Sequence, residues 1–217
     1  MSAFLGKIHF WLYKKIRLVI AREQLVLENA TATLDDLAEE LHETAISTYG
    51  APLDENIALE DVIDHGNIHG WLNNQIEVST VREASFIKDL VDCGGDEGIK
   101  AVLNAFAEQG FACGMVARDE LPELSPEMIY NVMQNYYLNG MPCDGGDTIV
   151  KSDENTHAWE GTHANQKVNW TKAGVDQKLM TKAYQEWFRG FVTAISESAY
   201  EFTVSNDTTP IYTIIKK

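Results

Sequence analysis

KIHFWLYKKIRLVIARE (residues 7–23) and NIHGWLNNQIEVSTVRE (residues 67–83) are the two stretches that decide the fold. Aligned without a gap, they agree at seven positions. These are Ile8/Ile68, His9/His69, Trp11/Trp71, Leu12/Leu72, Ile16/Ile76, Arg22/Arg82 and Glu23/Glu83. Average residue usage gives about one agreement in such a window. The agreement predicts an internal repeat of two similar amphipathic helices.

The histidine of each stretch lies fourteen residues before its glutamate, which is about 21 Å along a helix axis. Within one helix these two side chains cannot touch. If the helices are antiparallel neighbours, however, His9 approaches Glu83 and His69 approaches Glu23. A histidine held by a carboxylate can orient a metal ligand or act as a general base. In the alternative, the apolar residues form a seam and the polar groups satisfy one another at its ends.

Helical spacing of apolar residues continues outward from both stretches as far as Gly140. A long first helix begins near residue 3, and the third begins at Leu59 or shortly after Gly66. Glycines and a Ser-Pro pair supply the stops and starts. The expected helices cover residues 3–29, 33–49, 59–92, 96–116 and 125–139.

After Gly140 the sequence has the composition of short strands and turns. Strands are expected over residues 148–151, 156–163, 200–205 and 211–215, and a helix over residues 176–196. Residues 1–140 are therefore a helical bundle of about five helices, and residues 141–217 a small antiparallel sheet with one helix. Such segregation defines an α+β fold, which we expect to form one continuous domain.

The chain of 217 residues has a net charge of −16, which argues against nucleic acid as a partner. Basic residues gather in residues 1–22 and acidic ones in residues 33–64. The basic segment is either an arm for an anionic ligand or the packing partner of the acidic one. We expect no membrane span and no signal peptide. Three cysteines without metal-like spacing favour a reducing, cytoplasmic setting.

A candidate for chemistry is Cys143 in the turn MPCDGG (residues 141–146), at the junction of helices and sheet. His157 and His163 share a face if one strand holds both. Cys143, His163 and a helical histidine, His9 or His69, would suit zinc or iron. In catalysis, Cys143, His163 and His69 would supply the nucleophile and general base. Alternatively, the cysteine simply belongs to a glycine-rich structural turn.

The C-terminal part resembles a known family. WEGTH (residues 159–163), WTKAG (residues 170–174), Gly190-Phe191 and the closing segment from Ile211 to Lys217 carry the likeness. From Thr156 onward the layout is similar to the L-2-amino-thiazoline-4-carboxylate hydrolase-like family of small bacterial proteins. That family has a Cys-Pro after its first strand and a cysteine in its last. This chain has His163-Ala164 and residues such as Tyr212 there, so if those cysteines carry the activity of the family, we expect this chain to lack it.

Two classes of function follow. The first is a hydrolase-like enzyme for a small molecule, with a His/Cys metal site between helices and sheet. The alternative is a non-catalytic ligand-binding or sensor domain with an apolar pocket. The expected pocket residues are Trp11, Trp71, Trp159, Glu23 and Glu83. A homodimer is left open.

Overall fold

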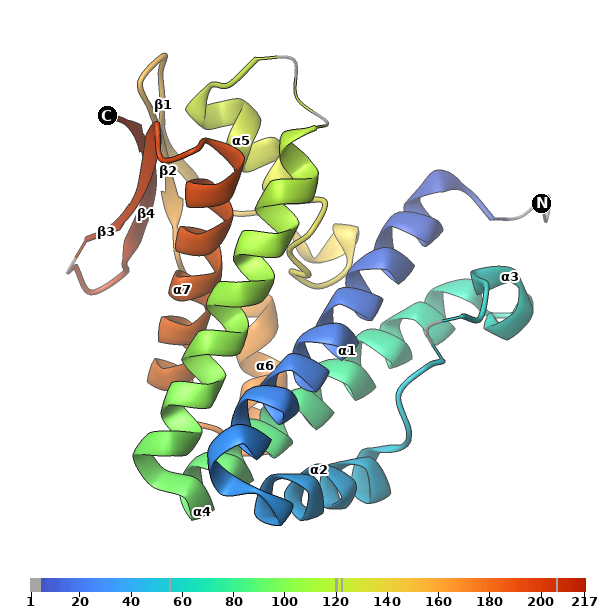
Figure 1. The fold of residues 1–217 in the computed structure, drawn as a ribbon. Helices are drawn as coiled ribbons and strands as arrows, with labels where there is room; N and C mark the ends of the chain where they lie inside the picture. Colours follow the sequence, from blue (N-terminus) through green and yellow to red (C-terminus); the bar gives the residue numbers. More distant parts are fainter. Residues whose placement is uncertain (1–4, 55, 120, 122, 206) are drawn as a thin grey trace.

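The structure, a computed structural model, describes residues 5–54, 56–119, 121, 123–205 and 207–217. Long helices form most of the molecule, and a four-stranded antiparallel sheet covers one side of them (Figure 1). The predicted α+β fold, with helices first and a small sheet last, is confirmed. The predicted start of the first helix at residue 3, and residue 206 of the predicted last turn, lie outside the described residues.

The matching stretches lie on two long helices. α1 spans Lys7–Leu34, followed by α2 (Asp36–Tyr49) and the short α3 (Leu59–Val62). α4 spans Ile68–Arg118 and turns sharply at Gly95, where φ is +54°. Glycine adopts positive φ without steric cost, so the predicted break between the third and fourth helices falls there. α1 and the first half of α4 lie side by side and run in the same direction, and the second half returns (Figure 1).

α5, at Pro126–Met133, ends earlier than expected. Ser125 caps it by accepting from the Met128 amide at 3.2 Å, as the Ser-Pro start predicts. Residues 136–138 are buried one after another. A helix at the surface cannot bury three successive side chains, because they point in different directions around its axis. The chain therefore leaves the helix and crosses the core as a loop.

The sheet has the strand order β1-β2-β4-β3, and neighbouring strands are antiparallel. The strands are β1 (Ile149–Ser152), β2 (Thr156–Glu160), β3 (Tyr200–Val204) and β4 (Ile211–Lys216). Apolar residues alternate with exposed ones along β3, so one face of that strand is buried. That face packs against the last helix of the chain.

Two helices, not one, accompany the sheet. α6 spans Ala164–Ala173 and α7 spans Gln177–Ile195. Because β2 ends at Glu160, the expected strand through residue 163 is wrong. His157 lies on β2, whereas His163 takes a left-handed conformation, with φ of +49°, at the start of α6. α7 packs against the returning half of α4 and contributes Tyr184, Trp187, Phe188 and Phe191 to the aromatic core.

A second, smaller core joins the first halves of α1 and α4 to the loop after α5. Its buried side chains include Leu12, Ile16, Leu72, Ile76, Leu138 and Met141. This core fixes the position of the loop relative to α1, where the candidate site lies. Within the described residues, no helix is both long and apolar enough to cross a bilayer.

Candidate functional site

The Arg-Glu pairs of the two matching stretches exchange partners. Arg22 donates from Nε and Nη2 to the Glu83 carboxylate at 2.7 and 2.8 Å. Arg82 donates from Nε to both oxygens of Glu23 at 2.9 Å. Because the helices run in the same direction, the antiparallel arrangement was wrong, and the glutamates bind Arg82 and Arg22 in place of the predicted His69 and His9.

His42, on α2, extends this network with its Nε2 2.9 Å from Glu23 Oε1. Burial opposes ionisation of Glu23, but the hydrogen bonds from His42 and Arg82 prevail and lower its pKa. Arg22 also donates to the Tyr184 hydroxyl at 2.9 Å, which ties the network to α7. The network is buried and joins four helices, so its evident role is structural.

His163 is enclosed by aromatic side chains. Its Nδ1 lies 3.0 Å from the Tyr137 hydroxyl, and its Nε2 lies 2.7 Å from the Tyr212 hydroxyl. Burial, with Lys167 nearby, lowers the pKa of His163 to about 3. Because each ring nitrogen has a tyrosine hydroxyl as its partner, neither is free to bind a metal. Trp159 is also core, packed on Tyr212 at a centroid distance of 5.8 Å.

The other predicted ligands lie at the surface or near it. Cys143 is exposed in the short 3₁₀ turn Pro142–Asp144 (η1). His69 is exposed in the first turn of α4, and half-buried His9 accepts from the Gly6 amide at 3.0 Å. In the part of the chain that the structure describes, no three His, Cys, Asp or Glu side chains are grouped to hold zinc or iron.

A pocket of about 140 Å³ lies between α1 and the loop after α5. Its lining residues are Trp11, Lys15, Gln134, Asn139, Gly140, Met141, Pro142, Gly145 and Gly146. Trp11 is thus the one predicted pocket residue that lines it. Trp71 instead packs on Tyr13, with ring centroids 6.4 Å apart.

Lys15 is the unusual residue of this pocket, because it is only 3% exposed. Its Nζ lies 3.3 Å from the Gln134 carbonyl oxygen and 3.4 Å from the centroid of the Trp11 ring. No carboxylate of the described residues lies within ion-pair distance of it. Carbonyl and ring both favour the ammonium, but neither carries a full negative charge. Burial therefore prevails and lowers the pKa of Lys15 to about 7.

Asp147 holds two of the lining side chains in place. Its carboxylate accepts from Asn139 Nδ2 at 3.1 Å, from Gln134 Nε2 at 3.4 Å and from the Tyr130 hydroxyl at 3.0 Å. Burial raises the pKa of Asp147 in spite of these bonds. Asn139 Oδ1 is buried without a hydrogen-bond partner among the described residues. A buried acceptor of this kind calls for a donor from a ligand or water.

Glycines shape the rim of the pocket. Gly140 has φ of +72°, and a Cβ there would lie 2.7 Å from Asp144 Oδ2. Gly145 has φ of +90°. Asp144 in turn accepts from the Met141 amide at 2.7 Å. This loop geometry therefore requires glycine at these positions, which explains the glycine-rich turn in the sequence.

Sequence reasoning missed Lys15, although a signal was present. Lys15 lies four residues after Trp11 and four before Val19, on the face of α1 that carries apolar residues. A lysine inside an apolar helical stripe is buried or paired.

Comparison of the chain with protein-family models, curated proteins and solved structures gives no match. The resemblance of residues 156–217 to the hydrolase-like family stays a prediction. Function must be argued from the site itself.

Proposed function

We propose that this chain is a hydrolase-like enzyme for a small molecule, with the Lys15 amine as its reacting group. The observation that carries the proposal is a buried lysine that lines a pocket and has no carboxylate of the described residues within ion-pair distance. Lysines of this kind are suited to nucleophilic chemistry, since an amine reacts only after losing its proton. With a pKa of about 7, roughly half of the Lys15 amines are neutral at pH 7.

The neutral amine would attack a carbonyl or imine carbon held in the pocket. With an imine substrate, the Lys15 nitrogen adds to the carbon and the amine of the substrate leaves, giving a Schiff base to Lys15. Water then adds to that carbon, releases a carbonyl product and regenerates the amine. The sum is hydrolysis of a carbon–nitrogen double bond, and no oxidant or metal takes part in it.

The size and lining of the pocket restrict the substrate. A volume of about 140 Å³ suits a substrate, or part of one, with few heavy atoms. Trp11 and Met141 offer apolar contact, and Gln134 and Asn139 are the polar, uncharged residues of the lining. Asp147 is a positioning residue here, since it holds Asn139 without lining the pocket.

The alternative is a non-catalytic ligand-binding or sensor domain that uses the same pocket. One observation favours it: of the described residues lining the pocket, Lys15 alone has an ionisable side chain. Multistep catalysis usually needs a further acid or base. In this alternative, Lys15 binds a small carbonyl compound reversibly and no turnover follows. For either function we propose a cytoplasmic setting, which suits the three free thiols.

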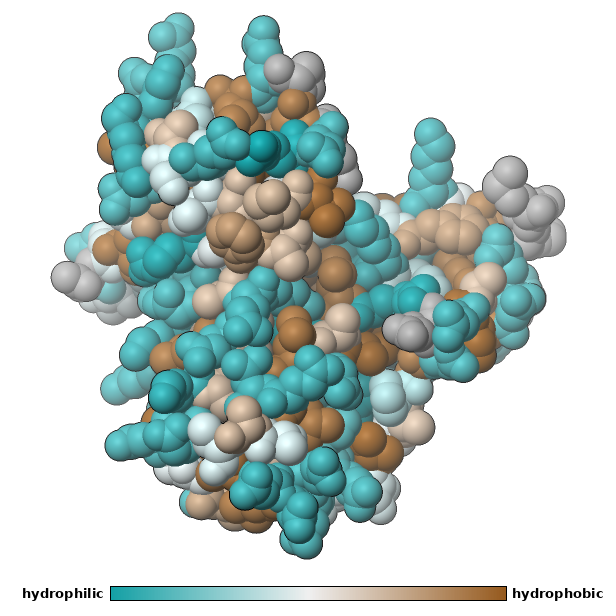
Figure 2. Space-filling view, viewed as in Figure 1, coloured by the Kyte–Doolittle hydropathy of each residue, from teal (hydrophilic) through white to brown (hydrophobic). Residues whose placement is uncertain are grey.

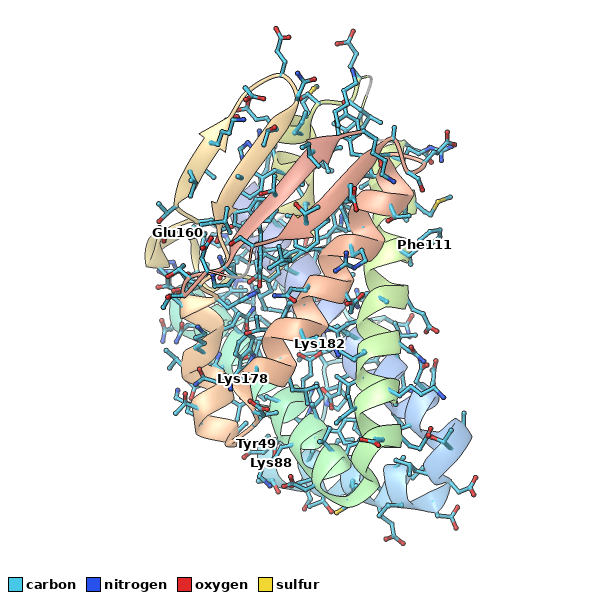
Figure 3. All side chains as sticks on the ribbon, turned by 90° about the vertical axis from the view of Figure 1, so that its left-hand side faces the viewer. Tyr49, Lys88, Phe111, Glu160, Lys178 and Lys182 are labelled. Atoms are coloured by element: carbon cyan, nitrogen blue, oxygen red, sulfur yellow. The ribbon has the colours of Figure 1, made fainter. Side chains whose placement is uncertain are left out.

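Reductive trapping tests the proposal. The full chain is incubated with glyoxylate or pyruvate, treated with borohydride, and examined by intact mass and peptide mapping. We expect one adduct, on Lys15, at aldehyde concentrations that leave exposed lysines largely unmodified. Lys15→Met should abolish it. Lys182→Met, which removes an exposed lysine on α7 (Figure 3), should leave it unchanged.

Labelling spread evenly over the lysines would overturn a reacting Lys15. If Lys15 is trapped selectively, small imines are then assayed for hydrolysis. Turnover that Lys15→Met removes supports the enzyme. Selective trapping with no turnover of any imine supports the binding domain instead.

A further inference from the structure

The outward face of α1 carries a regular pattern of its own. Lys14, Ala21 and Glu28 are exposed and follow one another at steps of seven residues. A step of seven returns to nearly the same side of a helix, with a drift of about 20°. Half-buried Leu18 and Leu25 lie beside this line. The result is a continuous stripe about four turns long, of the kind that packs against another helix.

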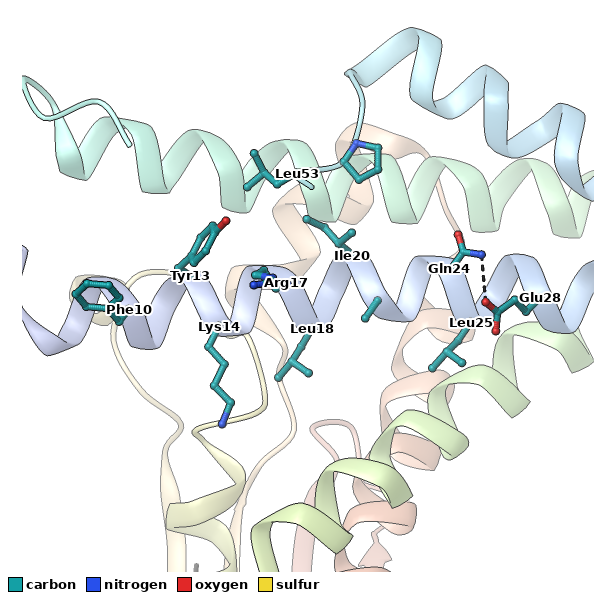
Figure 4. Close-up of a pocket in the computed structure, with 12 residues that line it drawn as sticks. Phe10, Tyr13, Lys14, Arg17, Leu18, Ile20, Gln24, Leu25, Glu28 and Leu53 are labelled. Carbon is teal, nitrogen blue, oxygen red and sulfur yellow. Dashed lines mark hydrogen bonds between the residues drawn. The ribbon is translucent and has the colours of Figure 1, made fainter. Parts of the chain in front are cut away.

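A large hollow lies along this stripe. It measures about 810 Å³ and is bounded on one side by Pro52 and Leu53 of the loop after α2 (Figure 4). Apolar side chains that line it are Phe10, Leu18, Ile20, Leu25, Pro52 and Leu53. Figure 2 shows hydrophobic residues between the polar ones along the course of α1. Apolar surface gathered in this way commonly marks a site of association.

We propose that this hollow receives α1 of a second copy of the chain, packed antiparallel, with the twofold axis passing through Ala21. Lys14 and Glu28 each lie seven residues from Ala21, on opposite sides. Such an axis therefore brings Lys14 of each copy opposite Glu28 of the other, and two ion pairs form. An isologous interface requires this self-complementarity.

The charges also decide the direction. A parallel pairing would place Lys14 opposite Lys14 and Glu28 opposite Glu28, and like charges repel. Ala21 at the axis is small enough to let the helices approach within the 8–10 Å that packed helices adopt. Leu18 of one copy then meets the neighbourhood of Leu25 of the other, which buries apolar surface on both sides of the stripe. This proposal does not rest on the chemistry of Lys15.

Sedimentation equilibrium of the full chain is the test, at concentrations from about 1 to 100 µM. We expect a dimer for the natural sequence. Lys14→Glu and Glu28→Lys should each raise the dissociation constant at least tenfold, because each places like charges opposite one another. The double variant K14E/E28K restores opposite charges and should recover the dimer. Lys182→Glu, with the same charge change on α7 (Figure 3), is the matched control and should leave the dimer intact.

Circular dichroism and thermal unfolding show whether each variant keeps its fold. A monomer at 100 µM overturns the proposal, and so does a dimer that neither single variant weakens. A double variant as weak as the single ones overturns the antiparallel pairing.

Cross-linking gives a second measurement that does not depend on affinity alone. In a chain with Cys93→Ser and Cys143→Ser, which removes the exposed thiols, Ala21→Cys places one thiol of each copy at the axis. Mild oxidation should then give a disulfide-linked dimer. Lys182→Cys in the same background should stay monomeric on a non-reducing gel. No cross-link at Ala21→Cys contradicts the proposed axis.

Discussion

Arg22 and Lys15 are both buried basic residues of α1, seven residues apart. They differ in whether a carboxylate lies beside the cationic group. Arg22 makes two short bonds to the Glu83 carboxylate. Among the described residues, the partners of Lys15 are a carbonyl oxygen and an aromatic ring. A buried cation with a carboxylate keeps its charge and cross-links the fold. One without a carboxylate loses its proton near neutral pH and becomes available for chemistry. The comparison separates a structural network from a candidate site on the same helix.

Removing the carboxylate of Glu83 should have the largest effect. Glu83→Gln leaves the Arg22 guanidinium buried without its counter-ion, and we expect a loss of about 3–5 kcal/mol in the free energy of unfolding. Urea denaturation at pH 7 measures it. Glu77→Gln is the control, because Glu77 pairs with Lys172 at 2.7 Å on the surface and should cost less than about 1 kcal/mol. Equal losses in the two variants would show that the buried pair has no special role.

Much of this fold, but little of the candidate site, could be predicted from the sequence. The matching stretches predicted two paired helices, and their Arg and Glu residues do meet. Periodicity fixes the buried face of a helix, but not the direction of its neighbour, and the His–Glu pairs depended on that direction. His163 was assigned to a strand because residues 156–163 have a strand-like composition, whereas the structure ends β2 at Glu160 and starts α6 directly after His163. The pocket depends on the path of residues 134–146, which long-range packing determines.

Lys15 should make stability rise with pH. Between its folded pKa of about 7 and its unfolded value of 10.5, the unfolded chain binds a proton at this lysine that the folded chain does not. The free energy of unfolding therefore increases with pH in this window, by up to about 1.4 kcal/mol per pH unit. Urea denaturation at pH 7, 8 and 9 measures the slope. Lys15→Met should flatten it, and Lys182→Met should not. A slope that Lys15→Met leaves unchanged would contradict a neutral buried amine.

His163 extends the comparison to a group that burial, with Lys167 nearby, keeps neutral. Its pKa falls from 6.5 to about 3, so between these values the unfolded chain alone is protonated there. Stability is therefore full above pH 6.5 and is lost as the pH falls below it. Between pH 6.5 and 5 we expect a loss of about 2 kcal/mol. His163→Gln, which keeps one donor and one acceptor, should remove this loss. The window lies above the range in which Glu23 takes up a proton, because the pKa of that carboxyl is lowered.

The smallest effect is expected for Cys143, which is exposed beside the pocket rim. The sequence predicts this residue as a nucleophile and a metal ligand. An exposed side chain whose nearest polar contact is Asp144 Oδ1, 3.9 Å from Sγ, contributes little to packing. Cys143→Ser should change the free energy of unfolding by less than about 0.5 kcal/mol. It should also leave reductive trapping at Lys15 unchanged, because the thiol does not line the pocket. Elemental analysis of both proteins completes the measurement. Zinc or iron that is bound to the natural chain and lost in Cys143→Ser would show that the cysteine is a metal ligand. The reactive lysine would then belong to a metal site.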